Sequence, residues 1–116
     1  HQRKIKDELQ QYLNSMDKKV AIWGAGHQSL AVIALADLAD KISYVVDSAP
    51  FKQNKFTPAT HIPIVAPEKL LSDPVDAVII MAASYSDEVA RNLLKSHKNK
   101  LSISILREEG LEILQE

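Results

Sequence analysis

The stretch KVAIWGAGHQSLAVIALADLA, residues 19–39, decides the fold. Residues 19–23 form a short apolar run, which is typical of a strand buried on both faces of a sheet. A glycine turn follows, and the segment after Ser29 is apolar on most sides, which indicates a buried helix. A buried strand, a glycine turn and a helix make the first part of a βαβ unit. The sequence therefore predicts an α/β domain with a parallel sheet.

The rest of the chain repeats this alternation. We expect further buried strands at residues 42–47, 75–81 and 101–106, a short helix or turn at 67–72, an amphipathic helix at 87–98, and a polar tail with at most a last helical turn at 108–116. Right-handed crossovers between such strands give a small Rossmann-like, three-layer domain. We predict a mostly parallel sheet of about four or five strands.

A separate helix is predicted ahead of the first strand. Apolar residues recur there at spacings of three and four, at Ile5, Leu9, Tyr12, Leu13 and Met16. We therefore divide the chain into a lead-in helix, residues 1–17, which tethers the domain to an upstream one, and a Rossmann-like domain, residues 18–116. The chain begins on His1 rather than Met, which suggests a fragment of a longer parent protein.

Composition excludes several classes of function. The 116 residues carry a net charge of -1 and no block of like charge, so we expect no nucleic-acid partner and no membrane surface. There is no cysteine, which excludes disulfides, a thiolate zinc site and a cysteine nucleophile. The histidines and acids lack metal-ligand spacing, so no metal site is predicted. A cytoplasmic protein is the expectation.

The turn from Gly24 to Ser29 resembles a dinucleotide fingerprint. Its glycines match the first two of G-x-G-x-x-G, and Ser29 takes the third position. The helix beyond offers free N–H groups to an anion, and Asp47 ends the second strand where a ribose-binding acid would stand. This pattern predicts binding of a phosphate or sugar group. The alternative is that the turn needs glycine for its geometry alone.

An NAD(P)-binding oxidoreductase or epimerase domain is the rival interpretation. The glycine turn and Asp47 permit it. A Tyr-x-x-x-Lys pair is missing at Tyr85, however, because Val89 stands four residues later.

The segment VVDSAPFKQNKFTPATHIPIVAP, residues 45–67, is long, polar and stiffened by four prolines. Lys52 and Lys55 can contact a pyrophosphate or stay solvated. Gln53 and Asn54 can read a base or sugar edge, or cap their own loop. His61 can bind a ligand or order the loop by bonding backbone groups, and we favour the second role.

A third group of candidates, Ser84 and Tyr85, follows the strand at 75–81, at the rim where open α/β sheets bind ligands. Tyr85 can stack on a base or pack at the edge of the cleft, and Ser86 can cap the next helix. We expect the glycine turn, the 47–63 loop and Ser84–Tyr85 to converge on this rim. The candidate substrate-binding residues are Gly24, Gly26, His27, Gln28, Ser29, Asp47, Lys52, Gln53, Asn54, Thr57, Pro58, His61, Ser84 and Tyr85.

Together, WGAGHQS and the loop after it closely resemble the C-terminal domain of sugar C-methyltransferases over residues 18 to about 106. The family loop reads approximately D-x-x-P-x-K-Q-x-x-x-x-P-G-x-H-I-P. The matching positions here are Asp47, Pro50, Lys52, Gln53, Pro58, His61, Ile62 and Pro63. Ala59 stands where the family usually has Gly, and His27-Gln28 replace small or lysine residues of the turn.

The resemblance implies a bacterial enzyme that methylates a carbon of a nucleotide-linked deoxysugar. In that family the C-terminal domain holds the nucleotide sugar against a middle domain, which carries S-adenosylmethionine and the general base. This chain would then position substrate, bind no cofactor itself and be inactive alone. Its partners would be a nucleotide-linked sugar and the upstream methyltransferase domain. A third interpretation is a non-catalytic interaction module that docks through an exposed Ile5-Leu9-Tyr12-Met16 stripe.

Overall fold

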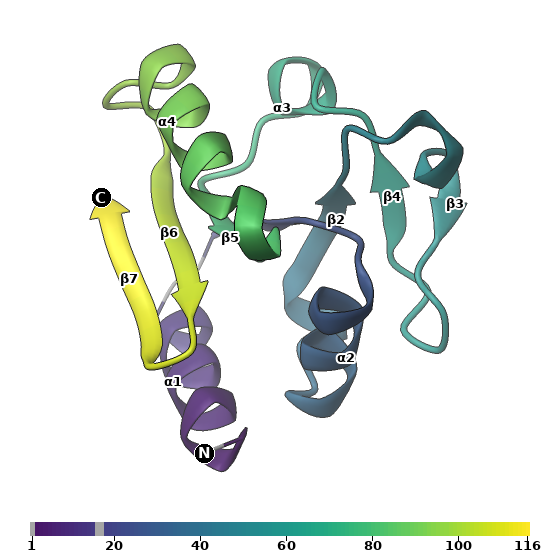
Figure 1. Cartoon of the computed structure of the whole chain (residues 1–116), viewed down its shortest axis with the longest axis vertical. Helices are drawn as coiled ribbons and strands as arrows, with labels where there is room; N and C mark the ends of the chain where they lie inside the picture. Colours follow the sequence, from purple (N-terminus) through teal and green to yellow (C-terminus); the bar gives the residue numbers. More distant parts are fainter. Residues whose placement is uncertain (1, 16–17) are drawn as a thin grey trace.

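The computed structural model describes residues 2–15 and 18–116 and has an α/β fold (Figure 1). The helices of four residues or more are α1 (Gln2–Asn14), α2 (His27–Leu35), α3 (Lys69–Ser72) and α4 (Ser86–Ser96). The strands are β1 (Val20–Trp23), β2 (Ile42–Val46), β3 (Lys55–Phe56), β4 (Pro63–Val65), β5 (Ala77–Ile80), β6 (Ser102–Arg107) and β7 (Gly110–Gln115). Short 3-10 turns η1 (Ala39–Lys41), η2 (Pro50–Lys52) and η3 (Ala83–Tyr85) connect them.

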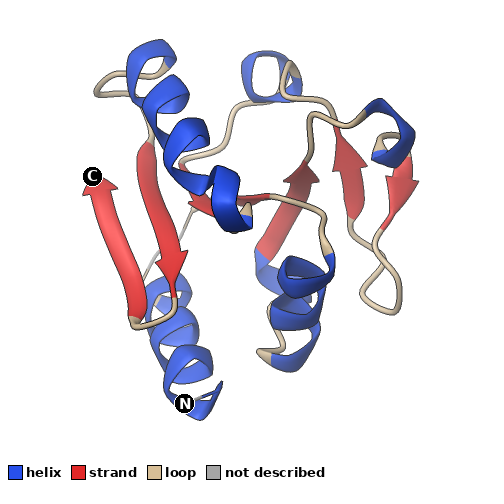
Figure 2. Cartoon of the chain, viewed as in Figure 1, coloured by secondary structure: helices blue, strands red, loops and turns tan. Residues whose placement is uncertain are grey.

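The strands form one sheet in the order β3-β4-β2-β1-β5-β6-β7 (Figure 2). The five central strands are parallel, and β3 and β7 pair antiparallel at the two edges. Val20 and Ile22 pack into the core that α1 and α2 share, whereas Ala21 packs into the core under α3 and α4. A strand whose alternate residues enter two cores is covered on both faces. The predicted Rossmann-like, three-layer fold is therefore confirmed.

The sheet has seven strands rather than the predicted four or five, because β3, β4 and β7 were not expected. Residues 110–115, expected in a polar tail, form β7, which pairs with β6 through a two-residue turn at Glu108 and Glu109. Gly110, at φ +144°, permits this turn, and a Cβ there would lie 2.5 Å from a carboxylate oxygen of Glu8. The second addition is the β3–β4 hairpin inside the expected loop. β3 and β7 are edge strands, where exposed residues mask the apolar signal, and β4 has only three residues.

The first helix is part of the same core. Leu9 and Leu13 of α1 are buried, Ile5 and Tyr12 pack against the same cluster, and the helix contacts β7. The stripe that an interaction module would expose therefore faces the sheet; Met16 lies outside the described residues. The role of residues 1–17 as a tether stays a prediction. No helix in the described ranges is both long and apolar enough to cross a membrane.

Candidate functional site

Gly24 makes the sharp turn after β1, and the fold requires a glycine there. Its φ is +125°, and an added Cβ would lie 2.3 Å from the carbonyl oxygen of Met81. Its N–H donates to the carbonyl of Val46, at 2.7 Å. The close approach of the chain after β5 leaves no room for a side chain. This glycine is therefore explained by packing alone.

Gly26 differs, because nothing in the fold requires it to be glycine. It precedes α2 in an extended conformation, with φ −83° and ψ 173°, and an added Cβ would meet no atom within 4 Å. No side chain caps α2 at this position. The first-turn amides thus have no side-chain cap at Gly26, and a helix N-terminus of this kind attracts anions. The open space beside them is where a ligand backbone or phosphate can approach.

The three residues after Gly26 have different environments. His27 and Gln28 are exposed beside the open space. Ser29 is buried, and its hydroxyl donates to the sulfur of Met81 at 3.8 Å. Ser29 thus allows α2 to pack closely on the strand ends, as a third glycine would. Ser29 is also one of the candidate substrate-binding residues, but its buried position beside Met81 favours this packing role.

Asp47 ties the glycine turn to the start of the loop. Its Oδ2 accepts the N–H of Ala25 and its Oδ1 accepts the N–H of Ala49, both at 2.9 Å. Lys52 Nζ lies 3.8 Å from Oδ2, and the amide of Gln53 donates to the backbone carbonyl of Asp47. With its side chain only 15% exposed, Asp47 acts as a clamp between two segments of the rim. The side chains of Lys52 and Gln53 therefore contact Asp47 and belong to the same clamp.

Phe51 is a rim residue that the sequence reasoning missed. It lies in η2, is 71% exposed, and has the amine of Lys52 at 5.7 Å from its ring centre. An exposed aromatic ring beside a cation provides a stacking surface for a flat ligand group. The available signal was an aromatic residue directly after the proline of a strand-end turn.

The second half of the 47–63 segment lies at the opposite edge of the sheet. Asn54, exposed at φ +63°, begins the turn into β3, which runs antiparallel to β4. Residues 57–62 therefore lie at the amino end of β4, away from the rim at its carboxyl end (Figure 1). The expected convergence of Thr57, Pro58 and His61 with the glycine turn is wrong. The reason is the β3–β4 hairpin, which carries the chain back across the sheet.

This amino-edge turn is closed by its own residues. Thr57 is buried, its hydroxyl accepts the N–H of Ile62 at 2.8 Å, and it also bonds the hydroxyl of Thr60. The ring of His61 stacks on Phe56, with centroids 4.2 Å apart and planes 5° from parallel. His61 thus orders the turn, as favoured from sequence, but through its ring. Pro58 is exposed.

The chain after β5 forms another part of the rim. Ala83 has φ +51°, and the hydroxyl of Ser86 accepts the N–H of Ala82 at 3.0 Å instead of capping α4. Ser84 and Tyr85 are exposed, Tyr85 by 68%. A cavity of about 490 Å³ lies beside them, and its lining includes Gln28, Met81, Ala83, Ser86 and Arg107. Tyr85 does not line this cavity, but its exposed ring is free to contact a ligand.

Arg107, at the end of β6, was also missed. Its guanidinium bonds Asp87 at 2.7 Å and Glu112 at 2.9 Å. The hydrogen bond from Arg107 and its charge lower the pKa of the Asp87 carboxyl, and the same contacts raise the pKa of Arg107. Two carboxylates already neutralise this cation. Arg107 thus forms a wall of the cavity rather than a free anion-binding group.

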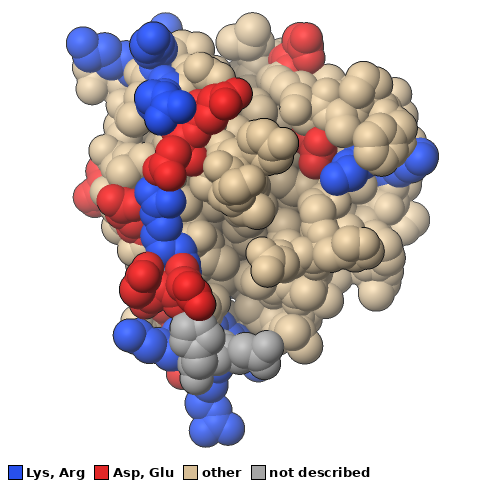
Figure 3. Space-filling model, in the orientation of Figure 1, with Lys and Arg blue, Asp and Glu red and all other residues tan. Residues whose placement is uncertain are grey.

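Charge is unevenly distributed on the face that Figure 3 shows. Acidic and basic side chains alternate along the side of α4, β6 and β7, and a smaller charged group lies near η2 on the other side. The surface between them is largely uncharged. A ligand on this face would meet neutral groups and helix dipoles more than formal charges.

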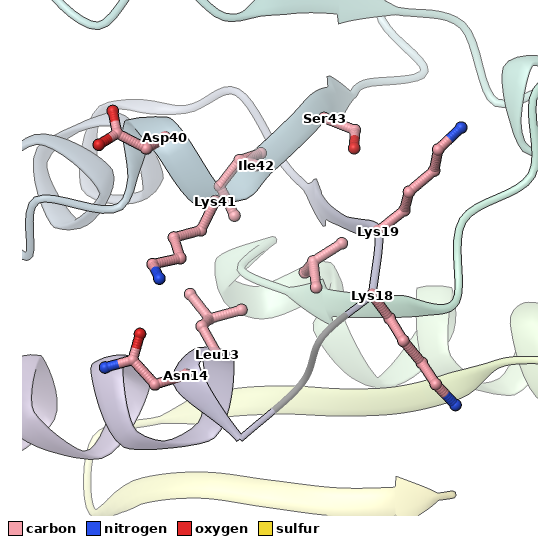
Figure 4. A pocket seen from close by; sticks show the side chains of 9 residues that line it. Leu13, Asn14, Lys18, Lys19, Asp40, Lys41, Ile42 and Ser43 are labelled. Atoms are coloured by element: carbon pink, nitrogen blue, oxygen red, sulfur yellow. The ribbon is translucent and has the colours of Figure 1, made fainter.

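A second cavity, of about 450 Å³, lies where β1 and β2 begin, and Lys18, Lys19 and Lys41 line it (Figure 4). Their amines point in different directions, and Lys19 pairs with Asp73 at 3.7 Å. The three charges therefore do not converge on one ligand position. In the part of the chain that the structure describes, no group of three His, Cys, Asp or Glu could hold a metal ion.

Comparison with known proteins identifies the family. The model of the C-methyltransferase C-terminal domain family matches residues 1–104, so the chain belongs to this family. None of the curated proteins compared matches the chain. Among solved structures, UDP-D-quinovosamine 4-dehydrogenase from Vibrio fischeri matches with a TM-score of 0.61 and 17% identity, covering 86% of this chain and 95% of that one. At this identity the likeness concerns the fold, which is that of a Rossmann-type enzyme.

Proposed function

We propose that this chain is the substrate-positioning C-terminal domain of an S-adenosylmethionine-dependent nucleotide-sugar C-methyltransferase, and that it binds a nucleotide-linked sugar at the carboxyl rim of the sheet. The observation that carries the proposal is Gly26. It leaves open space at the uncapped N-terminus of α2, where no packing contact calls for a glycine. Membership of the C-methyltransferase family supports a substrate of this class.

The rim offers a role for each ligand group. The diphosphate approaches Gly26 and the first-turn amides of α2, because the helix dipole favours negative charge there. Phe51 and Tyr85, the exposed rings, provide faces on which a base can stack. Asp47 holds the loop in place, and Lys52 adds a nearby positive charge.

The domain alone transfers no methyl group under this proposal. S-adenosylmethionine and the proton-abstracting base belong to an upstream methyltransferase domain of the same parent chain, in the cytoplasm. The residues of this domain would orient the sugar, so that the reacting carbon faces the methyl donor. No catalytic residue is assigned to this chain.

The rival NAD(P)-binding function has less support from the site. In dinucleotide folds, the acid after the second strand accepts the ribose hydroxyls. Here both oxygens of Asp47 already accept backbone N–H groups, and Lys52 lies beside one of them. Binding ribose would require this clamp to open.

The test is a nuclear magnetic resonance titration of the chain with a dTDP-linked sugar, a GDP-linked sugar and NAD. We expect one nucleotide sugar to shift the resonances of residues 24–28, 47–53 and 83–85 and to leave residues 57–61 unchanged. Gly26→Val should weaken that binding about tenfold or more, because its branched side chain fills the open space.

Gly26→Ala is the matched control, since its single methyl group meets no neighbour and should leave the stability unchanged. Tight NAD binding would refute the proposal, as would the absence of shifts with both nucleotide sugars.

A further inference from the structure

The cavity beside the rim contains a buried hydroxyl group whose proton is not used within the domain. Ser86, the first residue of α4, lines this cavity of about 490 Å³, although only 4% of the residue is exposed. Its oxygen accepts the N–H of Ala82 at 3.0 Å. A serine hydroxyl can also donate one hydrogen bond, and no hydrogen bond between described residues uses this proton. Because buried polar groups normally have partners, the proton is available to a molecule in the cavity.

The backbone before α4 holds this hydroxyl in place at an energetic cost. Ala83 lines the same cavity and has φ +51°, a left-handed conformation that an alanine seldom adopts. Strain of this kind persists only where the surrounding structure fixes it, and it is concentrated at ligand sites. The turn brings the N–H of Ala82 to the oxygen of Ser86. A hydroxyl that accepts one hydrogen bond is polarised and becomes a stronger donor for the next.

The other groups that line the cavity suit a sugar ring. Gln28 contributes an exposed carboxamide and Glu108 an exposed carboxylate, both of which can exchange hydrogen bonds with sugar hydroxyls. Apolar side chains complete the lining and can pack against the C–H groups of the ring: Met81, Ile105 and Leu106. None of the described residues that line the cavity is aromatic, so it offers a base no stacking surface. Its polar and apolar groups together are typical of a small-molecule site.

The strand order places this cavity on one side of the glycine turn and Phe51 on the other. Phe51 follows β2, whereas the cavity lies at the ends of β5 and β6, and β1 stands between β2 and β5. A diphosphate at Gly26, after β1, would therefore have an exposed aromatic ring on one side and a partly polar cavity on the other. The two ends of a nucleotide sugar, a flat base and a hydroxylated ring, match these two surroundings.

We propose that the cavity binds the sugar ring, with the base on the side of Phe51, and that Ser86 donates a hydrogen bond to an oxygen of that ring. This inference rests on the proposed function and extends it, because it divides the ligand between two parts of the rim and assigns sugar recognition to Ser86. A buried donor discriminates strongly between ligands, since a ligand without the matching acceptor leaves the donor unpaired. Ser86 is thus a specificity-determining residue, and it takes no part in bond formation.

Calorimetric titration of the chain with a nucleotide sugar and with the matching nucleoside diphosphate tests this assignment. The probes are dTDP-glucose with dTDP, and GDP-mannose with GDP. Wild type should bind one of the nucleotide sugars more tightly than its diphosphate. Ser86→Ala should weaken binding of that nucleotide sugar about fivefold or more, because a buried hydrogen bond to the sugar is lost. Binding of the diphosphate, which does not enter the cavity, should stay within about twofold of wild type.

Two further variants separate sugar recognition from local structure. Ser86→Asp keeps an oxygen that can accept the N–H of Ala82 and suits the first turn of a helix, but a carboxylate has no proton to donate. It should fold, as measured by urea denaturation, and lose the preference for nucleotide sugar over diphosphate. Ser86→Thr keeps the hydroxyl and should keep the preference. Ser96→Ala is the matched control, because Ser96 is the exposed last residue of the same helix and lies outside the cavity.

Three outcomes would overturn the assignment of the sugar to this cavity. These are equal affinities of wild type for nucleotide sugar and diphosphate, a wild-type preference in Ser86→Ala or Ser86→Asp, and an equal loss of preference in Ser96→Ala. The proposed function would stand in each case, because the nucleotide sugar would still bind to the chain. Failure of wild type to bind either nucleotide sugar would refute the proposed function and this inference with it.

Discussion

The carboxyl rim and the amino edge of the sheet are built differently, although residues of the same 47–63 segment contribute to both. At the rim, Asp47 bonds the distant Ala25 and leaves open space beside Gly26. At the amino edge, Thr57 bonds Ile62 five residues away and the turn closes on itself. A region held by distant segments can frame a cavity, whereas a self-closed turn serves its own stability. Rim substitutions should therefore change binding, and amino-edge substitutions should change stability alone.

Gly24→Ala should have the largest effect. The added methyl group would lie 2.3 Å from the carbonyl oxygen of Met81, at a φ of +125° that alanine avoids. We expect the free energy of unfolding to fall by about 3 kcal/mol or more, as measured by urea denaturation. The geometry of the carboxyl rim would be disrupted in the same variant.

Gly26→Ala provides the comparison, since the two glycines stand two residues apart in the same turn. It should change the free energy of unfolding by less than about 0.5 kcal/mol. Equal losses for the two variants would mean that Gly26 is also a packing glycine, and the distinction between them would fail.

Asp47→Ala tests the clamp of the rim. It removes a charged acceptor from the N–H groups of Ala25 and Ala49, which should cost about 2–3 kcal/mol of stability. The glycine turn and η2 would then separate, so nucleotide-sugar affinity should also fall. Calorimetric titration and urea denaturation measure the two effects.

Asp47→Asn retains one acceptor oxygen and should show a smaller loss of both quantities. Resonances of residues 57–61 should not move in either variant. Shifts that spread into the amino edge would show that the two regions are coupled.

Thr57→Val is the matching test at the amino edge. The isosteric change leaves the N–H of Ile62 without its buried hydroxyl acceptor and should cost about 1–3 kcal/mol of stability. Thr57→Ser keeps the hydroxyl and should lose less. Neither variant should alter nucleotide-sugar affinity, and a tenfold loss of affinity would return Thr57 to the ligand site.

The sequence predicted four of the five central strands, β1, β2, β5 and β6, because these strands are continuous apolar runs. The strands at 20–23, 42–46, 77–80 and 102–107 overlap the runs expected at 19–23, 42–47, 75–81 and 101–106, and the glycine turn located the helix after the first of them. Short edge strands gave no such signal, since Lys55 and Phe56 are exposed and no residue of β7 is buried. Edge strands read as loop or tail for this reason.

The candidate site was only half predictable for a related reason. Motif residues that are close in sequence were expected to be close in space. The two residues of β3, however, reverse the chain and carry Thr57 and His61 to the far edge. Phe51 lies in the turn after β2, and Arg107 is the last residue of β6. No spacing rule in the sequence identifies such positions as part of the rim. The contacts that decide their roles join segments far apart in the chain.

Ala59→Gly should have a small effect of the opposite sign. Ala59 has φ +64°, a conformation that costs an L-residue about 1–2 kcal/mol, and glycine adopts it freely. Part of this gain is offset, because glycine gives the unfolded chain more freedom. We expect a net stabilisation of about 0.5 kcal/mol in urea denaturation, with unchanged nucleotide-sugar affinity.

Ala83→Gly is the corresponding variant at the rim. Ala83 has φ +51° and lines the cavity, so the same change should also loosen the cavity wall and weaken nucleotide-sugar binding. If Ala59→Gly and Ala83→Gly changed nucleotide-sugar affinity equally, the proposed difference between a structural amino edge and a ligand-binding rim would be wrong.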